Sequence, residues 1–239
     1  MPTESEHLPG QPVLVLGMHR SGTSCLAGCL QAAGLVSGEV NTRARHNARG
    51  NREHMAVMQL NDEVLAANGG SWRSPPDSVA WTPAQIRSAR SVAASIAAEG
   101  IWGFKDPRTL LTIGGWLEAL GEVRLCASFR HPRAVARSLN SRDATLGEAE
   151  GLRLWHSYNS RLLELAAARP IAMVDYDQAG EPYLRAVERI AQRLGLPAPE
   201  AATRFYDTEL RHQTAEADVP LPDDLQLVHS RLRALAAAR

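Results

Sequence analysis

A short apolar run that leads directly into a glycine-rich loop constrains this chain more than any other feature. Val13 to Leu16 is unbroken and apolar, as in a central parallel strand that is buried on both faces. The sequence Gly17-Met18-His19-Arg20-Ser21-Gly22-Thr23-Ser24 follows, and apolar residues then recur at helical spacing. The glycines let the backbone turn tightly and approach a ligand closely. The pattern therefore predicts an anion-binding turn at a helix N-terminus.

This loop lacks the lysine that nucleotide triphosphatases carry. Its glycine spacing is that of a P-loop, but Thr23 stands where that lysine would be. The cation lies inside the loop instead, at Arg20. Four polar side chains surround the turn: Arg20, Ser21, Thr23 and Ser24. We expect the loop to bind a 5′-phosphate-like group rather than a Mg-bound triphosphate.

Strand and helix patterns alternate along the rest of the chain. Further strands are predicted at 101–104, 123–129 and 171–174. Helical patterns lie at 26–33, 55–65, 82–100, 109–121, 134–138, 152–168, 183–194 and 225–235. This alternation predicts a P-loop-type, three-layer α/β/α fold with a mainly parallel central sheet. We expect a single domain over 1–239, with a flexible N-terminus at 1–11 and a C-terminal helix at 220–239.

Composition narrows the range of partners. The formal net charge is zero, so the chain has no bulk attraction to nucleic acid or to membranes. No apolar segment is long enough to span a membrane, and the polar N-terminus lacks the hydrophobic region of a signal peptide. The three cysteines have neither disulfide nor metal-ligand spacing. These features predict a cytoplasmic protein without a metal site.

Basic residues follow three of the predicted strands. Arg20, Lys105 and Arg130 each come at or just after a strand end. In parallel sheets ligands bind beyond the carboxyl ends of the strands. The three cations should therefore meet at one edge and form a polyanion site.

Two motifs resemble those of sulfotransferases that use 3′-phosphoadenosine 5′-phosphosulfate (PAPS). The loop from Gly17 to Ser24 is similar to their 5′-phosphosulfate loop, and tyrosylprotein and many bacterial sulfotransferases carry arginine where Arg20 stands. Arg130, followed by Ser138 eight residues later, is similar to their 3′-phosphate motif. The resemblance implies that PAPS is the cofactor and that adenosine 3′,5′-bisphosphate (PAP) is the product.

Two further stretches resemble the tyrosylprotein and bacterial branch. Lys105-Asp106-Pro107-Arg108 is similar to a segment whose lysine is catalytic there, and Val174-Asp175-Tyr176-Asp177 is similar to the motif that ends the last core strand. Together the four motifs cover about 13–196. The family's C-terminal Arg-Lys-Gly adenine loop is absent, which leaves the adenine-binding residues open.

The resemblance implies roles for individual residues. Arg20 and Lys105 would neutralise the leaving phosphate without a metal ion, by analogy with phosphoryl transfer. Arg130 would bind the 3′-phosphate as a fork, with a hydroxyl from Ser138. The loop residues expected to contact the cofactor are His19, Arg20, Ser21, Gly22, Thr23 and Ser24, although His19 could equally serve only to fix the local geometry.

The general base has two candidates. Tyrosylprotein sulfotransferases use a glutamate after the first helix, and Glu53 is the best positional match, with His54 as the runner-up. The alternative for Glu53 is a carboxylate that only interacts with a helix N-terminus. His54, Trp72 and Arg108 are candidate acceptor contacts, although tryptophans usually serve in packing.

The expected function is metal-independent transfer of a sulfuryl group to a hydroxyl or amine of a small-molecule, sugar or peptide acceptor. The acceptor's identity stays open, and a homodimer is possible. A P-loop kinase is one alternative, with Asp175 as a Mg-orienting acid. A non-catalytic nucleotide-binding module is another, but it would not need Lys105 and Glu53.

Overall fold

The computed structural model describes residues 10–44, 47, 49–178, 180–206 and 220–238. The predicted N-terminal segment 1–11 therefore lies largely outside the described residues. The strands are β1 (Val13–Leu16), β2 (Gly103–Lys105), β3 (Arg124–Phe129) and β4 (Ile171–Asp175). The helices are α1 (Thr23–Ala32), α2 (Met55–Ala67), α3 (Pro83–Ile96), α4 (Thr109–Leu120), α5 (Pro132–Arg142), α6 (Glu148–Ala168), α7 (Glu181–Arg193), the 3₁₀ helix η1 (Pro199–Phe205) and α8 (Asp223–Ala237).

The four strands form one parallel sheet in the order β2-β1-β3-β4. Val15 of β1 pairs with Lys105 on one side and with Cys126 on the other. Phe129 at the end of β3 pairs with Asp175 at the end of β4. The carboxyl ends of the strands therefore meet at one edge, as the sequence predicts.

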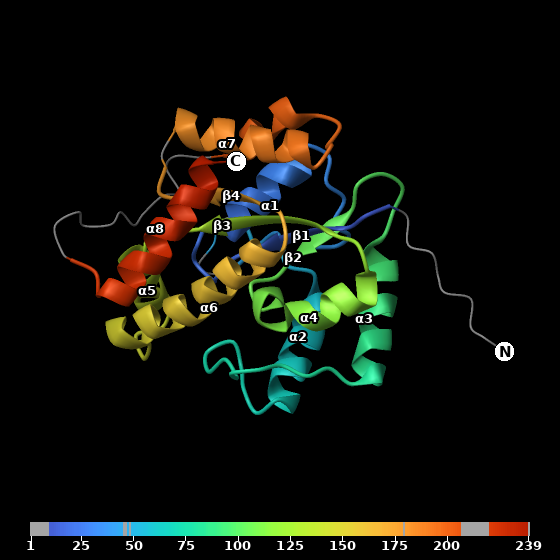
Figure 1. Cartoon of the computed structure of the whole chain (residues 1–239). Helices are drawn as coiled ribbons and strands as arrows, with labels where there is room; N and C mark the ends of the chain where they lie inside the picture. Colours follow the sequence, from blue (N-terminus) through green and yellow to red (C-terminus); the bar gives the residue numbers. More distant parts are fainter. Residues whose placement is uncertain (1–9, 45–46, 48, 179, 207–219, 239) are drawn as a thin grey trace.

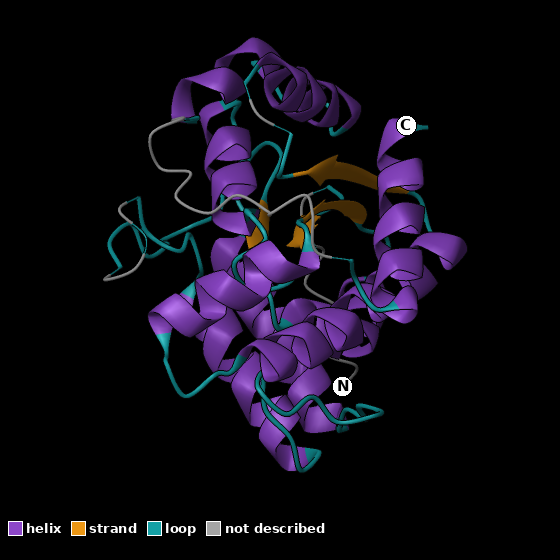
Figure 2. Ribbon diagram, turned by 90° about the vertical axis from the view of Figure 1, so that its left-hand side faces the viewer, coloured by secondary structure: helices purple, strands orange, loops and turns teal. Residues whose placement is uncertain are grey.

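Helices cover both faces of the sheet, which gives the predicted three layers (Figures 1 and 2). Leu14 and Leu16 pack into a core cluster with α2, α3, α4, α5, α6 and α8. Val13 and Val15 point the other way and pack with α1, α7 and η1. Because successive side chains of a strand alternate between faces, one apolar run serves both clusters.

The structure corrects several details of the sequence prediction. The helix expected at 82–100 ends at Ile96, and the helix expected to end at Ser138 continues to Arg142. The second strand covers Gly103–Lys105 rather than 101–104, and Trp102 precedes it as an isolated bridge to Val36. The helix expected at 152–168 begins at Glu148, and η1 was not predicted. The predicted C-terminal helix is present as α8.

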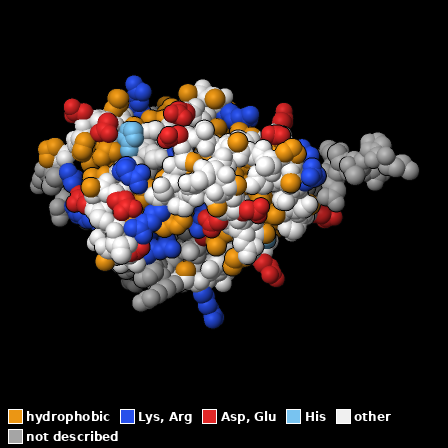
Figure 3. All heavy atoms as spheres, turned by 90° about the horizontal axis from the view of Figure 1, so that it is seen from below, with side chains coloured by type: hydrophobic (Ala, Val, Ile, Leu, Met, Phe, Trp, Pro, Cys, Tyr) orange, Lys and Arg blue, Asp and Glu red, His pale blue; other side chains and the backbone are white. Residues whose placement is uncertain are grey.

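The face of the molecule seen in Figure 3 carries charges of both signs. Seen from below, basic and acidic side chains are intermixed over the visible face (Figure 3), in line with the formal net charge of zero. None of the described helices has the length and apolar character needed to cross a membrane.

Candidate active site

The glycine-rich loop turns sharply between β1 and α1. Arg20 and Gly22 both have positive φ, 65° and 81°. A Cβ on Gly17 would lie 2.2 Å from the carbonyl oxygen of Ser128, so only glycine fits there. The first bond of the helix runs from Leu26 N–H to the Gly22 carbonyl, and the N–H groups ahead of it lie at the helix end.

Ser21 ties this loop to the neighbouring strand and carries an orphaned hydroxyl. Its carbonyl accepts a hydrogen bond of 2.6 Å from the Ser128 hydroxyl of β3. Its own Oγ is fully buried and has no hydrogen-bond partner among the described residues. Buried hydroxyls are normally paired, so the loop fits an additional acceptor such as a phosphate oxygen.

Arg20 joins the loop to the stretch from Arg130 to Ser138 that the sequence pattern singled out. Its Nε donates a 2.8 Å hydrogen bond to Ser138 Oγ on α5, across 118 residues of sequence. Burial, with the positive charges of Arg142 and Arg130, lowers the pKa of Arg20 from its ordinary value. Cations held this close repel one another, and a bound polyanion would relieve that repulsion.

Arg130 is held at the end of β3 by acidic and aromatic neighbours. Its Nε contacts Asp177 Oδ1 at 3.2 Å, and its guanidinium lies 5.3 Å from the centre of the Tyr176 ring. The other Asp177 oxygen accepts a 2.6 Å hydrogen bond from His131 N–H. Tyr176 also packs on the phosphate loop, because a Cβ on Gly22 would lie 2.2 Å from its ring. Arg130 and Arg20 therefore share one edge of the sheet.

Lys105 forms a buried ion pair with Glu53. Its Nζ lies 2.8 Å from Glu53 Oε1, and the two residues are only 3% and 8% exposed. Lys105 is also the only lysine in the sequence, alongside 25 arginines. Lysine presents a compact ammonium rather than a planar fork. The one lysine of the chain is buried at the end of β2, so the chain uses a lysine ammonium rather than a guanidinium at this position alone.

The backbone around Glu53 fixes this carboxylate. Glu53 O accepts a 3.0 Å hydrogen bond from Asn41 N–H, and Arg52, with a φ of 59°, donates its N–H to Asn41 O. His54 is the N-cap residue of α2 and is half-buried. Burial lowers the pKa of His54, while the charge of Glu39 opposes that shift. Of the two candidate bases, Glu53 is the one that contacts Lys105.

A buried amide holds α2 against α4 behind this pair. Asn61 is fully buried; its Nδ2 donates to Thr109 Oγ1 at 3.0 Å and to Asp106 Oδ1 at 3.3 Å. Its Oδ1 accepts from Thr112 Oγ1 at 2.7 Å and from Trp116 Nε1 at 2.8 Å. All four polar positions of the amide are satisfied inside the core.

Replacing Asn61 by leucine should destabilise the protein by roughly 3 kcal/mol or more, because several buried donors lose their partner. Urea unfolding followed by circular dichroism measures the change. Glu63→Ala, at an exposed position of the same helix, is the matched control and should shift stability little. An unchanged urea midpoint for Asn61→Leu would contradict this role.

Asp106 and Arg108 pair with each other next to Lys105. Arg108 contacts Asp106 Oδ2 at 2.9 Å and Asp62 Oδ1 at 2.6 Å. Burial raises the pKa of Asp106 to about 6, against the opposing effect of Arg108. Arg108, a predicted acceptor contact, is thus engaged with two carboxylates.

Trp72 and His19 lie against each other at the side of the loop. Their ring centroids are 4.7 Å apart, and Tyr158 meets His19 edge-on at 6.1 Å. Tyr158 donates its hydroxyl proton to the Trp72 carbonyl at 3.1 Å. These contacts attach the irregular segment around Trp72 to the core beside the predicted site.

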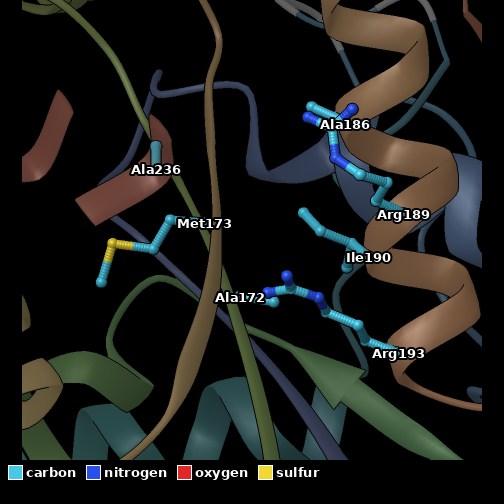
Figure 4. Close-up of a pocket in the computed structure, with 7 residues that line it drawn as sticks. All are labelled: Ala172, Met173, Ala186, Arg189, Ile190, Arg193 and Ala236. Atoms are coloured by element: carbon cyan, nitrogen blue, oxygen red, sulfur yellow. The ribbon is translucent and has the colours of Figure 1, made fainter. Parts of the chain in front are cut away.

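Outside this region, the described residues form a small crevice. Figure 4 shows this crevice between β4, α7 and the end of α8, and it contains none of the predicted site residues. Its lining residues are Ala172, Met173, Ala186, Arg189, Ile190, Arg193 and Ala236. Within the described ranges, no cluster of three or more His, Cys, Asp or Glu side chains could hold a metal ion.

Comparison with known proteins identifies the fold. The sulfotransferase domain of the Synechococcus PCC 7002 olefin synthase matches with a TM-score of 0.57, 19% identity, and coverage of 97% of this chain and 96% of that one. The sulfotransferase domain from the curacin biosynthetic pathway matches with a TM-score of 0.56, 13% identity, and coverage of 95% and 99%. This chain has the sulfotransferase fold. Sulfotransferase STF1 from Mycobacterium tuberculosis H37Rv also matches, with a TM-score of 0.52, 16% identity, and coverage of 94% and 76%.

The sulfotransferase fold is recognised here through structure. Neither a protein-family model nor a curated protein sequence matches the chain. The motifs that suggested the resemblance lie at the carboxyl edge of the sheet, where the fold brings Arg20 beside Ser138 and Lys105 beside Glu53. Two features escaped the sequence reasoning. The single lysine could have been found by counting residue types, whereas the Arg20–Ser138 contact required the fold.

Proposed function

We propose that this protein is an enzyme that transfers a sulfuryl group from PAPS to a hydroxyl or amine. The observation that carries the proposal is the buried Lys105–Glu53 pair, which holds a cation and a carboxylate beside a lysine-free phosphate loop. A module that only bound nucleotides would have no use for such a pair. The sulfotransferase fold supports the same conclusion.

The chain offers distinct groups for the two phosphates of the donor. The 5′-phosphate would lie at the loop, where the Ser21 hydroxyl is orphaned and the α1 N–H groups emerge. Thr23 and Ser24 would add hydroxyls. Arg130 would bind the 3′-phosphate, and Ser138 would be the second residue to contact it. Ser24 Oγ donates a 2.9 Å hydrogen bond to the Asn51 carbonyl, and it would exchange this partner for a phosphate oxygen when the donor binds.

Lys105 and Glu53 would have different roles in the transfer reaction. Glu53 would take the proton from the acceptor as the new oxygen–sulfur bond forms. Lys105, with Arg20, would stabilise the negative charge that develops on the bridging oxygen as its bond to sulfur breaks. These residues supply a general base and fixed positive charge, so the proposed transfer is metal-independent.

His54, Trp72 and Arg108 would contact the acceptor. Arg108 would do so while paired with Asp62 and Asp106. We expect a small molecule, a sugar or a peptide there, in a cytoplasmic setting and with homodimerisation as an option. Transfer of ³⁵S from labelled PAPS to a panel of hydroxylated acceptors tests the function. Labelled product with the wild type but not with Lys105→Met supports it. ATP-dependent phosphorylation of the same panel would favour a kinase.

Replacing Arg130 by alanine should weaken PAP binding by roughly tenfold to a hundredfold, since a hydrogen bond to a charged group contributes about 1.5–3 kcal/mol. Binding of adenosine 5′-monophosphate, which lacks the 3′-phosphate, should change little. Isothermal titration with both nucleotides measures the difference. Arg185→Ala is the matched control, because Arg185 is exposed on α7 and forms an ion pair with the exposed Glu181 one turn away. Equal losses for the two nucleotides would contradict the 3′-phosphate assignment.

A further inference from the structure

His19 has a buried polar atom that the proposed mechanism does not use. The residue is 7% exposed, and its Nε2 is buried with no hydrogen-bond partner among the described residues. Buried nitrogen atoms of this kind are rarely left unpaired. It lies between Met18 and Arg20 in the glycine-rich loop that precedes α1.

Aromatic packing fixes the imidazole in place. Trp72 lies on one side at 4.7 Å between ring centroids, and Tyr158 meets the ring edge-on. The Tyr158 hydroxyl is already used on the Trp72 carbonyl. Neither neighbour forms a hydrogen bond with Nε2, and both restrict rotation of the imidazole. The ring is therefore held ready for a ligand atom.

The surroundings of His19 favour the neutral form of the imidazole. Burial first, and then the positive charges of Arg108 and Lys105, hold the pKa of His19 well below its ordinary value. A neutral imidazole has one N–H donor and one acceptor nitrogen. Lys105 and Arg20, the two cations assigned above to the bridging oxygen, also contribute to this lowering of the His19 pKa.

We propose that His19, with its proton on Nε2, donates a hydrogen bond to an oxygen of the sulfuryl group of the bound donor. The inference rests on the proposed function, because it assigns a residue to the group that is transferred. It makes His19 a catalytic residue rather than a support for the loop alone.

A neutral donor suits this position. During transfer the sulfuryl group resembles sulfur trioxide, and negative charge moves from its oxygens to the bridging oxygen. A cation on the sulfuryl oxygens would favour the ground state, whereas cations at the bridging oxygen favour the transition state. Lys105 and Arg20 serve the bridging oxygen, and His19 positions the sulfuryl group without adding charge.

The difference between PAPS and PAP tests the assignment, since only PAPS carries the sulfuryl group. In His19→Phe, which keeps an aromatic ring but no donor, the Kd for PAPS should rise about tenfold relative to wild type. The Kd for PAP should change less than about threefold. His19→Gln, which restores an N–H donor, should recover part of the PAPS affinity. His156→Phe, at a half-exposed surface histidine, is the control.

The outcomes separate the alternatives. Equal losses of PAPS and PAP affinity in His19→Phe would mean that His19 only shapes the loop. An unchanged PAPS affinity would mean that Nε2 binds water. Either result overturns the proposal. If His19→Phe does not fold, ¹⁵N NMR of the wild-type imidazole replaces it: PAPS, but not PAP, should shift the Nε2 resonance. A wild type that binds neither nucleotide would refute the proposed function itself.

Discussion

Replacing Lys105 by methionine should abolish sulfuryl transfer while leaving PAP binding largely intact. The ammonium is expected to stabilise charge that develops only in the transition state, and removing one such donor typically lowers kcat by about 10²–10³. Methionine fills a similar volume without the charge. Transfer of ³⁵S from PAPS measures the rate, and isothermal titration with PAP measures binding.

A double variant distinguishes the loss of turnover from the loss of stability. Lys105→Met leaves Glu53 buried without its partner, and breaking a buried pair costs about 3–5 kcal/mol of stability. Adding Glu53→Gln removes the uncompensated charge, so Lys105→Met/Glu53→Gln should regain much of that stability and remain inactive. A single variant that kept more than a tenth of wild-type turnover would remove Lys105 from the mechanism.

Glu53→Gln should lower kcat by about 10²–10⁴, the range expected for loss of a general base. Glutamine preserves the shape of the side chain and can still accept a hydrogen bond from Lys105, but it cannot take the acceptor's proton. PAP affinity should stay within a few-fold of wild type. Single-turnover transfer from PAPS gives the rate of the chemical step.

Glu39→Gln is the matched control for this prediction. Glu39 is an exposed carboxylate two residues before Asn41, whose backbone pairs with that of Arg52 and Glu53. It should transfer at the wild-type rate. Full turnover in Glu53→Gln would show that the base assignment is wrong. His54→Asn would then be the next variant, since His54 adjoins Glu53 at the start of α2.

Much of the fold was predictable because the hydrophobic pattern follows local geometry. Val13 to Leu16 predicts a central strand since both its faces are apolar, and both faces do meet a core cluster. The second strand was misplaced for a physical reason. Hydropathy ends its apolar run at Phe104, whereas the backbone pairing continues to Lys105, whose charged side chain is accommodated by Glu53.

The site was predictable in outline only. A cation at the end of each of three strands follows from the sequence, because parallel strands end at one edge. The contacts within the site do not follow, since Arg20 and Ser138 are 118 residues apart and Lys105 and Glu53 are 52 apart. The buried state of His19 depends on Trp72 and Tyr158, which come from distant segments.

Thermal unfolding with PAP, compared with ATP plus Mg²⁺, tests the central claim most directly. PAP at about 100 times its Kd should add roughly 2.7 kcal/mol of stability, which for a protein of this size raises Tm by about 5–10 °C. Mg²⁺ should not be needed, and Arg130→Ala should lose most of the shift at the same PAP concentration. Stabilisation by Mg·ATP with none by PAP would contradict the account and favour a kinase.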